Sequence, residues 1–328
     1  MKSGRTRGAT VIPVRESKTT LFGQAAVPEL TLLPAPSFGA YLEMDFGQVH
    51  GSAMQKTGRV CAYCGSNRGL TNEHLFPDCI YERTPGSMIS IARTSEGDKA
   101  IGGALEIGDV CARCNNGKLS VLDTYICELH DKYFKTIIHA GDRVDFHFDF
   151  DLLLRWLLKT GYNTARARGW HVKRDSELPQ YILGEGQRPS GFRVFLQLII
   201  PTPTSSREWV TKPDAAEVPP APARIDLLDV SKLAGFNMGY VVSLNSYLFT
   251  IFKEVDAVPS RIRKLVLINL LKHMLGACEI TDKERAIVYS SSLDFMALVD
   301  KNSVLLRHLE MMQRHNDQLK RKKLTSQK

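Results

Sequence analysis

The chain has 328 residues, 43% of them hydrophobic, and carries a formal net charge of +8 at pH 7. This length and apolar content allow one large or two ordinary domains with hydrophobic cores. The longest apolar run, residues 238–252, is interrupted by Ser243, Asn245 and Ser246, which excludes a membrane-spanning helix there. The basic balance suits a protein that binds a polyanion, although charge alone is weak evidence for such a partner.

Residues 1–57 form the first predicted region. They begin basic and polar, with Lys2, Arg5 and Arg7, and then contain several proline and alanine residues. This composition predicts a flexible segment with one short strand at residues 39–44. The segment has no apolar signal-peptide core, so we expect the protein to be cytoplasmic.

Two Cys-x-x-Cys pairs, Cys61/Cys64 and Cys111/Cys114, lie within the next region, residues 58–140. Each pair can direct two thiolates at one point, and two pairs complete the tetrahedral sulfur shell of a closed zinc site. Disulfides are the alternative, but they need an oxidising compartment. The doubled spacing therefore predicts one Zn²⁺ site, and four thiolates leave no open position, so this zinc should be structural.

Three further cysteines, Cys79, Cys127 and Cys278, bring the total to seven, an odd number that argues against a complete disulfide framework. We expect each of them to be a small, packed side chain. Cys127 and His130 form a Cys-x-x-His pair, which is the nearest rival metal pair. A predicted helix carries both residues, which favours packing.

The elements predicted within residues 58–140 are three strands and a helix. The strands lie at residues 70–76, 88–93 and 104–110, with a loop at 96–99 and a tight turn at 115–117. Ser120 and Asp123 have the spacing of a capping box, which predicts a helix from Ser120 to about residue 138. The motifs therefore fall on strand, strand and helix in that order.

The motifs of this region resemble those of the HNH endonucleases, the ββα-metal nucleases, and in particular their zinc-stapled, four-cysteine branch. The matching residues are Cys61-x-x-Cys64, Asn72-Glu73-His74-Leu75-Phe76-Pro77 and Cys111-x-x-Cys114-Asn115-Asn116-Gly117-Lys118. The resemblance covers residues 60–125. It implies an α+β protein in which a ββα-metal nuclease module with a structural four-cysteine zinc site precedes a mixed α/β C-terminal region.

The resemblance also implies roles for individual residues. His74 would be the general base, while Glu73 and Asn115 would bind a single catalytic Mg²⁺ or Mn²⁺ through oxygen ligands. Apart from the resemblance, we expect Lys118 and Arg68 to contact nucleic-acid phosphates. A solvated lysine is the alternative for Lys118.

Other readings of the same residues stay open. His74 can be an ordinary satisfied histidine, and Asn115 can be a turn or N-cap residue, with Asn116 as an alternative ligand. The family often has Asp where this chain has Glu73, and the Asn that often precedes the second cysteine pair is absent, with Asp109 nearest. Adjacent strand residues point to opposite sides, so Glu73 and His74 can share a site only if the backbone twists there.

Residues 141–328 are expected to form a mixed α+β domain. A helix at residues 149–168 has one apolar stripe and should pack against the nuclease module. Residues 202–223, rich in Pro, Ala, Ser and Thr, should be an exposed linker. Strands are also predicted at residues 181–183, 192–200, 224–230 and 238–252. Three further helices are predicted: one at residues 261–275, one that begins at the capping box Thr281/Glu284, and one at residues 303–323 that ends in a basic tail.

We therefore expect an HNH-type, metal-dependent endonuclease that hydrolyses phosphodiester bonds of duplex DNA. The alternatives are a non-catalytic zinc-stabilised module that binds DNA or RNA, and a zinc-supported protein-interaction module. One such site cuts one strand at a time, so a double-strand break would need a homodimer or two visits. A partner ATPase and a place in bacterial restriction or anti-phage defence are associations, without a physical argument from these residues.

Overall fold

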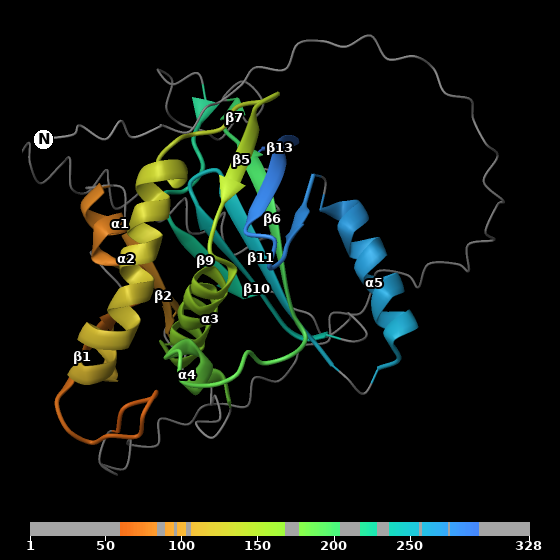
Figure 1. Ribbon diagram of the computed structural model, residues 1–328. Helices are drawn as coiled ribbons and strands as arrows, with labels where there is room; N and C mark the ends of the chain where they lie inside the picture. The colour runs from red at the N-terminus through yellow and green to blue at the C-terminus, as the bar shows by residue number, and fades with distance from the viewer. Residues whose placement is uncertain are drawn as a thin grey trace, which may run out of the picture. The chain divides into compact units, whose positions relative to one another are not determined.

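The computed structural model describes residues 60–83, 89–94, 97–102, 106–167, 177–203, 217–227, 236–255, 258–274 and 276–294 (Figure 1). All of these described residues belong to one compact unit. The strand predicted at 39–44 and the helix predicted at 303–323 with its basic tail lie outside the described residues.

The described part of the chain contains both helices and strands. In chain order the first elements are β1 (Leu70–His74), α1 (Asp78–Arg83), β2 (Ile89–Thr94), β3 (Gly97–Gly102), β4 (Glu106–Cys111), the π-helical turn η1 (Cys114–Leu119), α2 (Ser120–Leu129), the π-helical turn η2 (His130–Phe134), β5 (Arg143–His147), α3 (Phe150–Ala167) and α4 (Glu177–Ile182). They are followed by β6 (Phe192–Ile200), β7 (Thr202–Pro203), β8 (Glu217–Val218), β9 (Arg224–Leu227), β10 (Phe236–Leu244), β11 (Tyr247–Glu254), α5 (Ser260–His273), β12 (Cys278–Ile280) and β13 (Arg285–Asp294). Mixed α/β architecture is thus confirmed.

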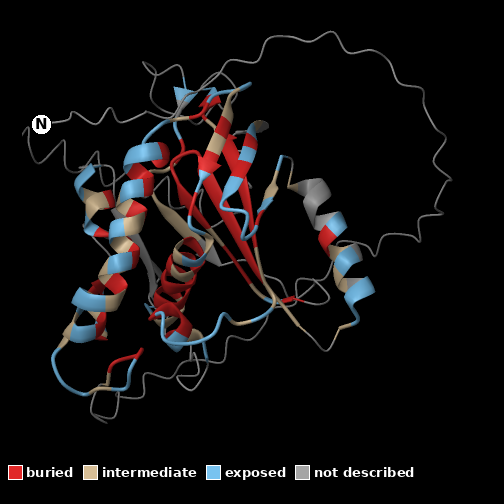
Figure 2. Ribbon diagram, viewed as in Figure 1, coloured by how far each residue is buried: buried red, intermediate tan, exposed pale blue. Residues whose placement is uncertain are grey.

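A seven-stranded sheet forms the centre of the C-terminal region, in the order β5-β13-β6-β11-β10-β9, with β12 also paired to β6. Its pairs are antiparallel except for β13 with β6. β6 and β11 are buried over most of their length, as Figure 2 shows in red. Their long apolar runs fit strands that are covered on both faces.

The strand predicted at 238–252 is two strands, β10 and β11, joined in a tight antiparallel hairpin. The register pairs Leu244 with Tyr247, so only Asn245 and Ser246 form the turn. Asn245 has a φ of +48°, and Asn tolerates this left-handed conformation better than most residues do. The same polar residues that interrupt the apolar run therefore reverse the chain.

Helix α3 packs between the sheet and the cysteine-containing module, as its apolar stripe predicts. Its residues 153–164 are buried, apart from Arg155. A Cβ at Gly161 would lie 2.6 Å from Cζ of Tyr240, so only glycine permits this approach of α3 to β10. The hydroxyl of Tyr240 donates to the Leu157 carbonyl at 3.1 Å, which fixes the helix against the sheet.

Two predicted elements of the C-terminal region are wrong. Residues 181–183 belong mainly to helix α4, where three residues gave too short a window to separate strand from helix. Gly184, with a φ of +74°, donates its N–H to the Tyr181 carbonyl and ends the helix. Thr281 and Glu284 lie in the turn between β12 and β13, with Glu284 at a φ of +56°, and begin no helix.

The linker predicted at 202–223 has structured ends. β7 and β8 pair through Thr202 with Val218 and Pro203 with Glu217, while residues 204–216 are not described. Thr202 is buried. The proline-rich composition therefore hid a short pairing that holds the two ends of the segment together.

The module at residues 60–134 consists of the antiparallel pair β1–β4 followed by one long helical stretch. β2 and β3 form a separate hairpin that lies between β1 and β4 in the sequence. The sequence predicts a loop at residues 96–99, but β3 begins at Gly97, so the prediction is wrong from that residue on. The turn predicted at 115–117 is helical, since η1 begins at Cys114 and continues into α2. Ser120 lies inside this stretch and donates its hydroxyl to the Gly117 carbonyl at 2.8 Å, so it caps no helix.

Cys79 of α1 and Cys127 of α2 form a disulfide, with their Cα atoms 6.1 Å apart. The prediction that both are lone packed thiols is therefore wrong. Cys278 is a free, partly buried thiol. An odd number of cysteines excludes the pairing of all of them, but it is compatible with one disulfide. The two cysteines of this disulfide are 48 residues apart in the sequence, so no local spacing pattern indicated the bond. The bond joins α1, which directly follows β1, to α2.

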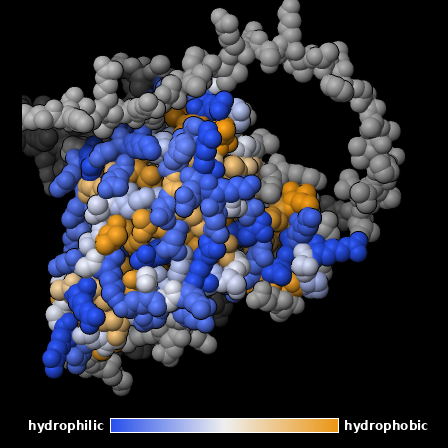
Figure 3. Space-filling model, viewed as in Figure 1, coloured by the Kyte–Doolittle hydropathy of each residue, from blue (hydrophilic) through white to orange (hydrophobic). Residues whose placement is uncertain are grey.

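Among the described residues no helix has the length and apolar character to cross a membrane. The face of the molecule in Figure 3 is mostly hydrophilic, with apolar colour in scattered patches. Large apolar side chains that remain exposed include Val121, Ile268, Ile287 and Tyr289. Scattered apolar residues of this kind are normal on protein surfaces.

The packing of α3 on the module predicts a large loss of stability for Trp156→Ala. Trp156 is fully buried and its ring lies 6.3 Å from that of Phe76, just after β1. Truncation of a buried aromatic side chain costs about 3–5 kcal/mol of unfolding free energy, measured by urea unfolding followed by circular dichroism. The control Val121→Ala, at a residue that is 54% exposed, should change it by less than about 0.5 kcal/mol. A loss under about 1 kcal/mol for Trp156→Ala would contradict the packing.

Candidate functional site

The four predicted zinc ligands converge. Cys61 and Cys64 lie in the loop before β1, Cys111 ends β4, and Cys114 begins η1. Their sulfur atoms all lie within 4.8 Å of one another, and the sulfurs of Cys64 and Cys111 are 3.5 Å apart. This is the one group of three or more such ligands among the described residues. The cluster can hold a metal ion such as zinc.

Backbone hydrogen bonds shape the two loops that carry the cysteines. The N–H of Gly65 donates to the Cys61 carbonyl at 2.9 Å, and the φ of Gly65 is +75°, a conformation that glycine adopts without strain. The N–H of Ala62 donates to the Asp109 carbonyl, and the N–H of Ala112 donates to the Gly69 carbonyl. Backbone hydrogen bonds thereby fix the two loops to each other, in addition to the proximity of their sulfur atoms.

The environment of the sulfurs favours a cation. Cys61, Cys111 and Cys114 are buried, while Cys64 is exposed. Burial raises the pKa of Cys114 above its ordinary value. Burial also acts to raise the pKa of Cys61, but backbone hydrogen bonds, led by one from Cys111, lower it to about 7. Ionised thiolates this close repel one another, so a bound cation with affinity for sulfur would stabilise them.

His74 lies at the end of β1, beside two carboxylates. Its Nδ1 is 3.1 Å from Oδ1 of Asp78, at the start of α1, and its Nε2 is 2.8 Å from Oε1 of Glu106, on β4. The register pairs His74 directly with Glu106. The side chain of His74 is 27% exposed, so solvent reaches the imidazole.

Asn115 ties the beginning of the helix to β1. Its Nδ2 donates to the Asn72 carbonyl at 2.8 Å and to Oγ1 of Thr71 at 3.0 Å. The pairing of β1 with β4 is irregular between Thr71 and Glu73, so Asn72 lies at a bulge, where its carbonyl can turn to the helix. Asn115 is within η1 and does not cap it, so the N-cap and turn readings of Asn115 are wrong.

Asn72 connects Asn115 to His74. Its side chain donates to Oε2 of Glu106 at 2.7 Å, and the other oxygen of Glu106 faces His74. Asn115, Asn72, Glu106, His74 and Asp78 therefore form one continuous polar row across the module. His74, which belongs to this row, is partly exposed, whereas its neighbour Glu73 is buried.

Glu73 points into the interior and does not join this row. Its Oε1 lies 2.5 Å from Nζ of Lys159 on α3, and only 2% of the side chain is exposed. The same Nζ lies 2.6 Å from Oδ1 of Asp123 on α2. Burial raises the pKa of Glu73, against the opposing effect of Lys159. The two carboxylates hold the pKa of Lys159 above its ordinary value in spite of burial, so the ammonium stays charged.

The catalytic divalent metal that the resemblance implies does not fit the side chains as they lie. The carboxylate of Glu73 is buried against Lys159. The amide of Asn115 donates to β1 through its nitrogen, so its oxygen alone is left as a ligand. An oxygen-ligated Mg²⁺ keeps several waters and needs a site that is open to them. The roles of Glu73 and Asn115 as metal ligands therefore stay predictions.

Of the two predicted phosphate contacts, Arg68 is exposed in the loop before β1. Lys118 forms an ion pair with Glu185, which follows α4. Lys118 and Glu185 line a hollow of about 260 Å³ together with Cys64, Arg113, Cys114, Gln180 and Leu183. A phosphate at Lys118 would have to displace Glu185.

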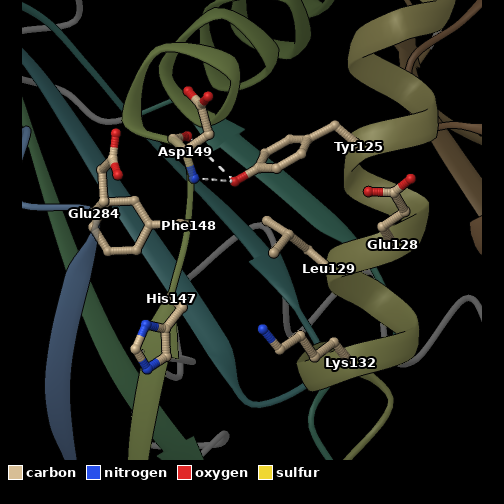
Figure 4. A pocket seen from close by; sticks show the side chains of 8 residues that line it. All are labelled: Tyr125, Glu128, Leu129, Lys132, His147, Phe148, Asp149 and Glu284. Atoms are coloured by element: carbon tan, nitrogen blue, oxygen red, sulfur yellow. Dashed lines mark hydrogen bonds between the residues drawn. The ribbon is translucent and has the colours of Figure 1, made fainter. Parts of the chain in front are cut away.

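A larger hollow of about 390 Å³ lies away from all the predicted site residues (Figure 4). Tyr125, Glu128, Leu129 and Lys132 line it from the α2–η2 stretch, and His147, Phe148, Asp149 and Glu284 line the other side. The Tyr125 hydroxyl accepts from the Asp149 N–H at 2.7 Å, so the wall is fixed. The charges of both signs around this hollow indicate no single ligand class.

Sequence reasoning missed three residues that surround the predicted base and its neighbour. Asp78 could have been found, because it follows His74 by four residues at the start of a helix. Lys159 also gave a signal, as a lone charge within the apolar stripe of the predicted helix. Glu106 gave none, because its place beside His74 depends on the register of β1 with β4.

Comparison of the chain with protein-family models, with curated proteins and with solved structures found no match.

The cysteine cluster predicts one tightly bound metal ion per chain. We expect elemental analysis of the purified protein to find one zinc, and Cys111→Ser to remove it and lower the melting temperature. Because the ligands must be deprotonated, zinc should dissociate as the pH falls and the thiolates become protonated. Cys278→Ser is the matched control and should keep the metal. A metal-free wild-type protein with unchanged stability in excess zinc would contradict the assignment.

Proposed function

We propose that the protein is a zinc-stapled, HNH-type endonuclease that hydrolyses phosphodiester bonds of duplex DNA. One observation supports this most: four cysteines join the β1–β4 pair to the start of the following helix, and a solvent-accessible His74 lies at the end of β1. The order of strand, strand and helix around a sulfur cluster is the arrangement that the sequence resemblance implies. The net charge of +8 suits a polyanionic substrate.

In this proposal His74 activates the attacking water. Asp78 accepts a hydrogen bond from Nδ1, which selects the tautomer with Nε2 as the proton acceptor. Nε2 lies 2.8 Å from Oε1 of Glu106, so Glu106 has to turn away before a water can reach Nε2 and give its proton to the imidazole. Asp78 thus orients the imidazole, and His74 acts as the general base. No step is assigned to a divalent metal, since the Glu73 carboxylate is buried against Lys159.

A non-catalytic, zinc-stabilised nucleic-acid-binding module is the second candidate. The observation that favours it is the burial of Glu73 against Lys159, which leaves the implied metal site without its carboxylate. Both candidates predict salt-dependent retention on DNA, because Lys and Arg contacts with phosphates release counterions. Only the first predicts cleavage.

A plasmid-nicking assay with zinc-loaded protein in Mg²⁺ or Mn²⁺ separates the two candidates. We expect wild-type protein to nick supercoiled plasmid and His74→Ala to lower the rate by about 10²–10⁴-fold, the usual contribution of a general base. DNA binding by the variant should stay within about twofold of wild type. His139→Ala is the control, because His139 is exposed and belongs to no part of the site. Binding without nicking by wild-type protein would favour the non-catalytic module.

A further inference from the structure

Lys159 is a lysine without solvent exposure, and its ammonium group contacts two carboxylates. Nζ lies 2.5 Å from Oε1 of Glu73, and 2.6 and 2.8 Å from the two oxygens of Asp123. The three residues come from α3, β1 and α2, which are distant in sequence. An unpaired buried charge is very unfavourable, so each of these contacts constrains the elements that carry it.

The contact with Glu73 also fixes the orientation of His74. Neighbouring side chains on a strand point to opposite faces, so an inward Glu73 places His74 on the outward face. α3 anchors the chain on the other side of His74 as well, because Trp156, nearly one turn before Lys159, packs against Phe76. Leu75, which lies between His74 and Phe76 in the chain, is also buried. His74 is therefore presented to solvent by neighbours that are all held inside.

The Glu73 carboxylate already has a cation at contact distance, so a second cation there would have to replace Lys159. Lys159 already neutralises this carboxylate at contact distance, in a site that excludes water. A hydrated Mg²⁺ or Mn²⁺ would have to displace the ammonium from Glu73 and bring its own waters into the core. Asp123, 25% exposed, would then hold Lys159 alone.

We infer that Lys159 is a positioning residue for His74: as the resident counter-cation of Glu73 it fixes the end of β1 with the imidazole outward, and Glu73 is not a divalent-metal ligand. The inference deepens the proposed function and rests on it for the role of His74. It reassigns Glu73 from metal binding to positioning. It also gives helix α3, which lies outside the region of resemblance, a direct part in building the site.

The first test measures the reactivity of His74 without any nuclease assay. Diethylpyrocarbonate modification of the zinc-loaded full chain, followed by peptide mass spectrometry, gives rates for His74 and for the exposed His139 and His147 in the same molecule. In Lys159→Met the uncompensated Glu73 should pull the end of β1 out of place. The rate at His74, relative to those two references, should change by at least about threefold, and Lys159→Arg should restore it in part.

Matched variants keep this test decisive. Lys135→Met makes the same change at an exposed lysine and should leave the relative rate unaltered. If Lys159→Met fails to retain zinc, Glu73→Gln tests the same link while leaving the ion pair of Lys159 with Asp123 intact. A relative His74 rate within about 1.5-fold of wild type in the folded, zinc-loaded variant would overturn the positioning role.

The second test addresses the metal directly. Mn²⁺ binding to zinc-loaded protein, followed by the electron paramagnetic resonance signal of free Mn²⁺, should give a Kd for Glu73→Gln within about threefold of wild type. A Kd at least tenfold weaker would overturn the inference, because it would identify Glu73 as a ligand. Wild-type protein that neither binds Mn²⁺ nor nicks DNA would instead contradict the proposed function, while the His74 modification rates would still decide the positioning role.

Discussion

Four sulfur atoms within 4.8 Å of one another are the constraint on which the rest of this site depends. The cysteines come from the loop before β1, the end of β4 and the start of η1, so they fix the relative positions of the β1–β4 pair and the helix. Thiolates at this separation need a cation, and zinc has the matching affinity for sulfur and the matching geometry. Four thiolates would close the shell, so such an ion would stabilise the fold and leave the chemistry to side chains outside it.

Helix α3 is the second support of the same site. One face of the helix contacts the module repeatedly: Tyr162 donates to the Ala62 carbonyl at 2.9 Å, and Arg166 forms an ion pair with Asp109 of β4 at 3.0 Å. The opposite contact, of Gly161 with Tyr240, joins the helix to the large sheet. This helix thus contacts both the cysteine module and the sheet, beside the direct contact of Phe134 with Tyr247 of β11.

Much of this arrangement could be predicted from the sequence, for physical reasons that differ between elements. The spacing of the cysteines predicted their convergence, and the apolar stripe of residues 149–168 predicted α3 and its packing. Local patterns failed where long-range contacts decided the outcome. Residues 115–117 are of turn-like types, yet the amide of Asn115 is satisfied by β1, and the segment is helical. Asp123 has the position of a capping residue, yet its partner is Lys159, 36 residues later.

The arrangement of the candidate site was the least predictable part. Side-chain alternation warned that Glu73 and His74 face opposite sides, but only the fold identifies Lys159 as the partner of Glu73. The bulge at Asn72 lies before Glu73 and does not turn it outward. Motif spacing thus places residues near one another along the backbone, whereas their orientation depends on partners contributed by another region.

X-ray absorption at the zinc K edge of the purified full chain tests the central claim most directly, because it reports the ligands of the ion itself. The account predicts a single shell of four sulfur atoms at about 2.3 Å. A shell that contains nitrogen or oxygen ligands, or a protein that holds no zinc, would contradict it.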